Sequence, residues 1–399
     1  MPRYAASRQK ACTSCSTAKT RCDRKAGQCT RCALRGLSCA YPLGTQLADS
    51  AADATTDSNI AVAGVTAAYG PSVSAIPLGA DAQYSARNRT SPAALRNRVE
   101  SITTELFCPI DADAIKNRWL HAHLSASGLY QKSYSTAITA FIYRILNSYV
   151  GIVIRGYGIP PFVHTSHMMA INTMPALSTC LTLVRMCCKP LPGSEHVIVD
   201  TIQGEMKRLY DQHRNYNEVA LFAAFQAYLV YCMVLFFRLN EGSLSFRRQA
   251  MTDLQTLACA SSRGGLACVA ESISARPRWE AWIVAEAKRR TLFTMYLFDS
   301  LLAAEEGLPT PIGIELKELS GPASRQLWTA STRQGWETAY GLYRADWVRG
   351  FCIDELWPLP ENLDESEILA RRSRVDRWLE DVDEFGTMLY AITCSTHGV

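Results

Sequence analysis

Residues 12–39 read CTSCSTAKTRCDRKAGQCTRCALRGLSC and hold six cysteines in two copies of one spacing. Each copy is C-x2-C-x6-C: Cys12, Cys15 and Cys22 form the first half, and Cys29, Cys32 and Cys39 form the second. A C-x2-C pair sets two thiolates on one turn, where both can bind a tetrahedral Zn2+ at about 2.3 Å. Two zinc ions need eight coordination positions, so six cysteines suffice if two of them bridge. The repeat suggests that equivalent members of the two halves are the bridges.

This stretch resembles the DNA-binding domain of the fungal binuclear zinc cluster transcription factors, in which six cysteines hold two zinc ions. The resemblance implies that Cys12 and Cys29 bridge the metals. It also implies that Cys15 and Cys22 complete the first site and that Cys32 and Cys39 complete the second. The family's proline two residues before the fourth cysteine is Gly27 here, and we expect a more flexible turn without loss of the cluster.

Disulfides and a purely structural zinc site are the two other uses that such cysteines can have. Disulfides require an oxidising compartment, yet the first ten residues, MPRYAASRQK, contain no apolar signal segment. A purely structural zinc knuckle remains an alternative, because zinc supplies folding energy whether or not DNA is bound. The nine other cysteines lie in apolar runs without metal-like spacing and are expected to be free thiols of a reduced protein.

The basic charge of the chain is concentrated around this motif. Residues 1–44 contain nine Lys and Arg and a single acidic residue, whereas the rest of the chain has 32 basic and 36 acidic residues. Two Zn2+ and six thiolates lower the charge of the segment from +8 only to +6. A compact and strongly basic segment is typical of a domain that binds the phosphates of double-stranded DNA.

Within this segment, the first half carries most of the cations beside its cysteines. By the family resemblance, Lys19 lies at the end of a short helix and reaches guanines in the major groove, where O6 and N7 are acceptors. Arg21, Arg24 and Lys25 are expected mainly to bind phosphates. We therefore predict recognition of a CGG-type triplet by the first half, and packing by the second half with its two leucines, Leu34 and Leu37.

The sequence predicts a mostly α protein with three parts. Residues 8–43 form the zinc cluster domain. Residues 44–90, which are rich in Ala, Ser, Thr, Gly and Asp, form a disordered linker. Residues 91–399 form a large all-helical domain, which loosely resembles the regulatory domain that accompanies the zinc cluster in this family. A short heptad pattern from Leu95 to Leu106 predicts a helix that docks on this domain, and a homodimer through that helix is a second interpretation.

Two segments are expected to form helices at the centre of the helical domain. Residues 219–237, VALFAAFQAYLVYCMVLFF, are long enough to span a membrane, but we expect a helix buried on all sides and no membrane partner. In the helix predicted over 278–308, Glu286 can pair with Arg289 and Arg290, and the run Lys288-Arg289-Arg290 is interpreted as a charged face.

The acidic C-terminal part has apolar residues at helical spacing. Val375, Trp378, Val382, Phe385 and Met388 follow one stripe, which predicts a packed helix. Residues 354–367, which contain Trp357 and prolines, are the expected place for an exposed acidic contact.

No constellation of residues indicates an enzyme. The sequence has no Gly-rich phosphate loop, no G-x-S-x-G and no H-E-x-x-H. The pairs His121/His123 and His164/His167 have no carboxylate or cysteine close by in sequence to complete a metal site.

The expected function is a nuclear, sequence-specific regulator of RNA polymerase II transcription that contacts DNA and the transcription machinery. The resemblance also suggests control of a biosynthetic gene cluster for a secondary metabolite. The alternative is a zinc-stabilised protein-interaction adaptor that does not read DNA.

Overall fold

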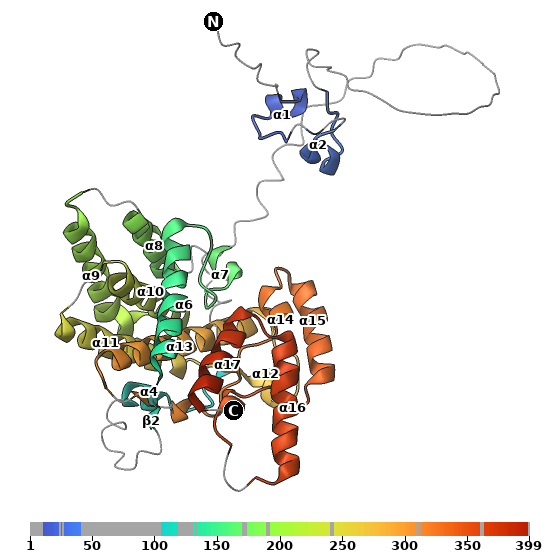
Figure 1. The fold of residues 1–399 in the computed structure, drawn as a ribbon. Helices are drawn as coiled ribbons and strands as arrows, with labels where there is room; N and C mark the ends of the chain where they lie inside the picture. The colour runs from blue at the N-terminus through green and yellow to red at the C-terminus, as the bar shows by residue number, and fades with distance from the viewer. Residues whose placement is uncertain are drawn as a thin grey trace, which may run out of the picture. The chain divides into compact units, whose positions relative to one another are not determined.

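The computed structural model describes residues 11–23, 25, 28–40, 105–118, 131–132, 134–169, 174–188, 192–239, 243–308, 310–311, 313–359 and 363–397. The chain divides into two compact units, Met1–Ala82 and Gln83–Val399 (Figure 1). The predicted linker 44–90, most of the predicted helix at 95–106, and Arg24 and Gly27 lie outside the described residues.

The described part of the N-terminal unit contains two short helices, α1 (Thr13–Thr17) and α2 (Thr30–Leu34). Each begins directly after the first cysteine of one half of the repeat, Cys12 or Cys29, whose backbone is extended. Four fully buried cysteines are the centre of this unit, and Ala11, Cys22 and Cys39 pack around them.

The C-terminal unit is helical, as predicted. Its α-helices are α4 (Ala112–Lys116), α6 (Thr136–Arg155), α7 (Thr165–Met169), α8 (Pro175–Leu183), α9 (Glu195–Gln212), α10 (Glu218–Phe237), α11 (Leu244–Arg263), α12 (Val269–Ser272), α13 (Trp279–Glu305), α14 (Arg325–Thr329), α15 (Arg333–Asp346), α16 (Glu365–Asp381) and α17 (Glu384–His397). Short 3-10 helices are η2 (Val184–Cys188), η3 (His213–Asn215), η4 (Ile314–Leu316) and η5 (Ile353–Leu356).

Two pairs of very short strands join distant segments of this unit. β1 (Leu106–Phe107) pairs antiparallel with β3 (Ala267–Cys268), and β2 (Gln131–Lys132) pairs with β4 (Thr310–Pro311). The predicted helix over 95–106 is therefore wrong at Leu106, which lies in strand β1 opposite Cys268 of β3. Gly265 permits this approach, because its φ is +98° and a Cβ atom there would lie 2.3 Å from Leu106 Cβ.

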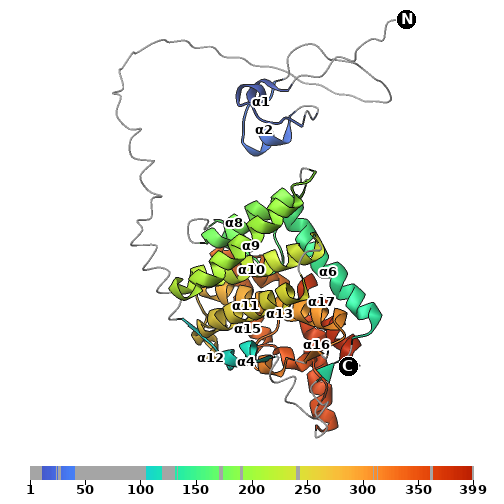
Figure 2. The same cartoon turned by 90° about the vertical axis from the view of Figure 1, so that its left-hand side faces the viewer.

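Helix α10 is the apolar centre of the unit, enclosed by α6, α8, α9, α11 and α13 (Figure 2). Helices α6 and α10 are both long and apolar enough to span a membrane. In α10, however, 89% of an 18-residue apolar stretch is buried inside the protein. Gln226, the clearest polar interruption of this apolar run, donates from Nε2 to Phe162 O at 2.8 Å and to Thr291 Oγ1 at 3.1 Å. The prediction of a helix buried on all sides is confirmed.

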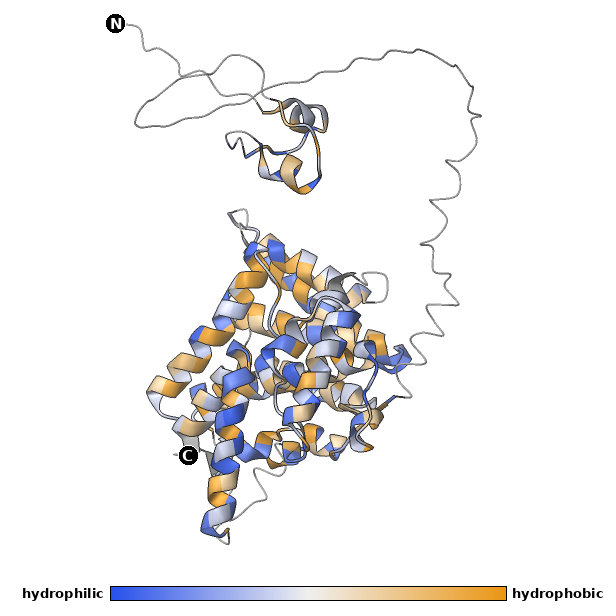
Figure 3. Ribbon diagram, turned by 90° about the vertical axis from the view of Figure 1, so that its right-hand side faces the viewer, coloured by the Kyte–Doolittle hydropathy of each residue, from blue (hydrophilic) through white to orange (hydrophobic). Residues whose placement is uncertain are grey.

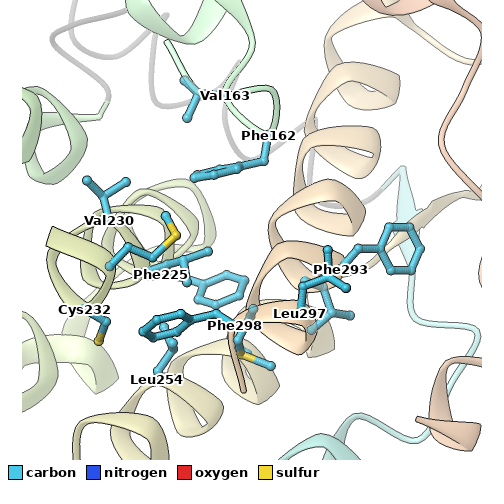
Figure 4. Packing of buried hydrophobic residues seen from close by; sticks show 14 of the residues in the cluster. Phe162, Val163, Phe225, Val230, Cys232, Leu254, Phe293, Leu297 and Phe298 are labelled. Atoms are coloured by element: carbon cyan, nitrogen blue, oxygen red, sulfur yellow. The ribbon is translucent and has the colours of Figure 1, made fainter. Parts of the chain in front are cut away.

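Aromatic side chains fill the space between α10 and α13. Phe225 of α10, Phe298 of α13 and Phe162 lie in this space and are each at most 2% exposed (Figure 4). Burying one such side chain stabilises the fold by about 1.5–3 kcal/mol. The outer helix α16, in contrast, carries long hydrophilic stretches (Figure 3).

The prediction of a charged face on α13 is wrong, because the helix is buried all round from Ala281 to Ala303. Lys288 donates from Nζ to Ser261 O at 3.0 Å and to Gly265 O at 3.2 Å. Arg290 is fully buried and bonds to Glu286 Oε1 at 2.7 Å and to Asp383 Oδ2 at 2.6 Å.

The C-terminal stripe is packed, as predicted, but it belongs to two helices. The chain leaves helical conformation after α16, at Val382 and Asp383, and α17 then begins at Glu384. Asp383 Oδ1 accepts from Gly386 N at 3.2 Å while its Oδ2 binds Arg290. The break thus brings a carboxylate to the buried arginine.

The predicted exposed acidic contact at 354–367 is wrong in its first part. Glu355 is partly buried and accepts two hydrogen bonds from Arg374 at 2.6 and 2.8 Å. Arg371 donates to the backbone oxygens of Asp354, Glu355 and Trp357. Residues 360–362 lie outside the described part of the chain.

Replacing Arg290 by Met should destabilise the helical unit by about 3–5 kcal/mol, because Glu286 and Asp383 would keep their buried charges without the partner. Urea unfolding of the full zinc-loaded chain, followed by helical circular dichroism, measures the loss. The matched control is Arg208→Met, which breaks a surface pair with Glu205 and should cost less than about 1 kcal/mol. Equal losses in the two variants would contradict the assigned role of Arg290.

Candidate metal centre and nucleic-acid interface

The two halves of the cysteine repeat have the same backbone construction. Cys15 and Cys32 lie on α1 and α2, and the second residue after each helix has a left-handed backbone, Lys19 (φ 47°) or Gly36 (φ 62°). The next residue donates its N–H back to the helical cysteine: Thr20 N to Cys15 O at 3.0 Å, and Leu37 N to Cys32 O at 2.9 Å. The sequence repeat is therefore also a structural repeat.

The cysteine sulfurs are spaced as the ligands of tetrahedral zinc. The Sγ atoms are separated by 3.8 Å for Cys12 and Cys29, 3.7 Å for Cys12 and Cys32, and 3.7 Å for Cys15 and Cys29. A tetrahedron with bonds of about 2.3 Å has edges of about 3.8 Å. The separations among these four sulfurs thus match those of zinc ligands.

The sulfur contacts fall into two overlapping sets. Cys15 contacts Cys12, Cys22 and Cys29, whereas Cys39 contacts Cys12, Cys29 and Cys32. Cys12 and Cys29 are common to both sets, as in two tetrahedra that share the edge between these two sulfurs.

The pKa values of the two cysteines common to both sets, Cys12 and Cys29, shift in the opposite direction from those of Cys15 and Cys39. Backbone N–H groups of Cys15 and Cys32 lower the pKa of Cys12 and of Cys29 respectively, but burial and the neighbouring thiols outweigh this effect. The pKa of Cys12 is thereby raised to about 12, and that of Cys29 is raised further. The pKa values of Cys15 and Cys39 are lowered. Because zinc binds thiolates, metal binding to Cys12 and Cys29 must release their protons.

Side chains outside the cysteine set connect the halves. Asp23 accepts from Thr30 N at 3.1 Å and from Thr30 Oγ1 at 2.6 Å, and these bonds lower the pKa of Asp23. Arg31 donates from Nη1 to Cys15 Sγ at 3.7 Å. This contact between halves was missed in the sequence analysis, because nothing in the spacing indicates which way Arg31 points along α2.

The predicted DNA-contacting residues are exposed wherever the structure describes them. Lys19, Arg21 and Lys25 are exposed on the first half, and Arg24 lies outside the described residues. Lys25 Nζ lies 4.0 Å from Asp23 Oδ2 at the surface. Leu34, predicted to pack, is 82% exposed, so the packing role given to the second half is wrong at this residue.

The histidine pairs do not form a second metal site within the described residues. His164 is buried and bonds to Ser166 Oγ at 2.7 Å and to Trp328 O at 2.9 Å. Burial lowers the pKa of His167 to about 3, so its imidazole stays uncharged at neutral pH. The ring lies in the core near Phe222. His121 and His123 lie outside the described residues.

Comparison with known proteins identifies one region. Residues 10–47 match the model of the fungal Zn(2)-Cys(6) binuclear cluster domain, which binds two zinc ions. No curated protein and no solved structure matches the chain.

The purified full chain should contain two zinc ions, and Cys12→Ser should lose both, since a bridging cysteine belongs to both tetrahedra and its loss leaves each with only three thiolates. Metal analysis after gel filtration measures the stoichiometry. Cys180→Ser, which alters a buried thiol of the helical unit, is the control and should keep both ions. One zinc in the wild type, or two in Cys12→Ser, would contradict a shared cysteine.

Proposed function

We propose that this chain, a zinc-cluster DNA-binding regulator by its fungal Zn(2)-Cys(6) binuclear cluster domain, reads short CGG-type triplets in nuclear DNA and thereby controls RNA polymerase II transcription. The observation that supports this most is the exposed basic surface of the first half, held on a core of cysteines whose sulfurs are spaced for zinc. Such a surface binds phosphates, and its lysine at a helix end can reach base edges.

The proposed metal ligands are the six cysteines of the repeat. Cys12 and Cys29 bridge the two ions, Cys15 and Cys22 complete the first site, and Cys32 and Cys39 complete the second. The overlap of the two contact sets at Cys12 and Cys29 supports this assignment. In this arrangement zinc fixes the turn from which Lys19 projects.

The backbone of Lys19 supports its role in base reading. A non-glycine residue in the left-handed region costs roughly 1–2 kcal/mol, and the equivalent position of the second half is Gly36. The first half therefore keeps a lysine where glycine would suit the backbone better. An exposed side chain at a strained position that does not serve the fold points to a functional role.

The other cations of the first half are proposed to bind phosphates. Arg21 and Lys25 are exposed on either side of Cys22, and Arg24 lies between them in sequence. Phosphate contacts fix the position of the domain on the duplex without reading sequence.

The helical unit is proposed to regulate this activity and to contact the transcription machinery. We further propose that the target is a biosynthetic gene cluster for a secondary metabolite, by resemblance to regulators of that type. A homodimer through residues 91–107 is the less favoured arrangement. The zinc-cluster family consists of transcription factors, which supports a regulator in preference to an enzyme.

One observation favours the alternative of a protein-interaction adaptor. Leu34 and Leu37 are 82% and 38% exposed on the second half. Exposed leucines on a small domain suit a protein partner as well as a neighbouring segment of the same chain.

Lys19→Ala should weaken binding to a CGG-containing duplex by about 1–3 kcal/mol while leaving binding to scrambled DNA nearly unchanged. Lys19→Gly should lose the same preference and also relieve the backbone strain, so its zinc cluster should be at least as stable as that of the wild type. Fluorescence anisotropy on both duplexes measures the preference, and Arg35→Ala in the second half is the control. Equal weakening on both duplexes would show that Lys19 does not read bases.

Binding to DNA should fall steeply with salt, by about 0.9 in log K per unit of log salt for each phosphate contact. Three to four contacts from the first half predict a slope of roughly −3 to −4. A titration series between 50 and 200 mM salt, a range over which this effect is large, provides the slope. A flat dependence would favour the adaptor.

A further inference from the structure

A cavity of about 430 Å3 lies in the helical unit between the first half of α11 and the last turns of α13. Helix contacts join these two elements directly. The volume falls in the range of small-molecule sites, roughly 300–1,000 Å3. The DNA-binding function of the cysteine repeat does not involve this cavity.

The inner wall of the cavity is apolar. Met251, Leu302 and Ala303 line it and are 4%, 7% and 2% exposed. A second, smaller hollow shares Arg247, Met251 and Leu302 with it and is lined further by Phe236 and Phe298. A hydrocarbon or aromatic body can therefore lie against this wall and exclude water from it.

Three of the four charged residues of the lining already have an opposite charge beside them. Arg248 Nη2 lies 3.1 Å from Glu306 Oε2. Asp299 Oδ2 lies 2.9 Å from Nη1 of Arg118, a residue outside the lining. These pairs leave the cavity close to neutral apart from the fourth residue, Arg247.

Arg247 differs from the other three charged residues of the lining in having no ion pair within 4.0 Å among the described residues. Its guanidinium carbon lies 5.1 Å from the centre of the Phe236 ring, and its buried Nε has no hydrogen-bond partner in the described part of the chain. Its charge influences the exposed Glu305, whose pKa is raised by burial and only partly lowered by Arg247. A buried donor without an acceptor is costly, so an anion bound here would satisfy it.

We propose that this cavity binds a small organic monoanion with an apolar body. Its carboxylate pairs with Arg247, and its body lies on Met251, Leu302 and Ala303. A multiply charged anion such as phosphate would meet the carboxylates of Asp299 and Glu306 and an apolar wall. A cation would leave Arg247 without a partner. The proposal concerns the helical unit alone, so it does not depend on DNA recognition by the cysteine repeat.

Calorimetric titration of the full zinc-loaded chain tests this with sodium decanoate as the anionic probe and 1-decanol as its neutral match. The wild type should bind decanoate more tightly than decanol. Arg247→Met keeps the length of the side chain but removes the charge, so it should weaken decanoate binding about tenfold or more and leave decanol binding unchanged. Arg144→Met, which removes an exposed arginine from α6, is the matched control and should change neither.

A second variant tests the location of the site without changing charge. Thr252 lines the cavity and is exposed, so Thr252→Trp should narrow the cavity and weaken both probes while helicity and melting temperature stay the same. Decanoate binding no tighter than decanol binding in the wild type would overturn the proposal. Unchanged probe binding in Thr252→Trp, or equal loss of decanoate binding in Arg144→Met and Arg247→Met, would do so as well.

Discussion

The N-terminal unit depends on the contact among its cysteine sulfurs. Four fully buried cysteines take the place of a hydrophobic core in its described part, and their neighbours are Ala11 and two further cysteines. So little apolar surface cannot offset the conformational entropy of ordering some thirty residues. Thiolates at separations of 3.7–3.8 Å also repel one another unless a metal neutralises them. Zinc is therefore the source of folding free energy for this unit, and every exposed side chain on it is positioned through the metal.

The structural repeat within this unit is symmetric in backbone and asymmetric in chemistry. The two halves share their helix, their left-handed residue and the hydrogen bond that follows it. One half then presents Lys19, Arg21 and Lys25, whereas the other presents Arg35 beside a glycine and two leucines. A single metal framework can in this way hold one surface suited to DNA and another suited to a protein or to a neighbouring segment.

The helical unit, unlike the N-terminal unit, is held together by a large apolar core. Several charged side chains are buried within that core. Glu286 illustrates how these are tolerated: burial raises its pKa, but the adjacent Arg289 and Arg290 lower it more, so the carboxylate stays ionised. Its oxygens also accept from Ala323 N at 2.9 Å. Such a network joins α13 to the C-terminal helices at defined positions, which apolar contacts alone would leave less specific.

The sequence by itself determined the local features of this protein. The spacing of six cysteines predicted the zinc cluster, and the count of Lys and Arg located the basic segment. The helices predicted at 219–237 and 278–308 match α10 and α13 nearly to their ends. These features depend on residues near one another in the chain. Only the tertiary structure decided which side chains meet across long distances. The burial of the Lys288–Arg290 run, the break at Val382 and Asp383, the contact of Arg31 with Cys15 and the cavity beside Arg247 all arise where separate segments pack together. A charged residue looks the same in sequence whether water or a buried carboxylate becomes its partner, because the packing of distant segments decides which of the two it meets.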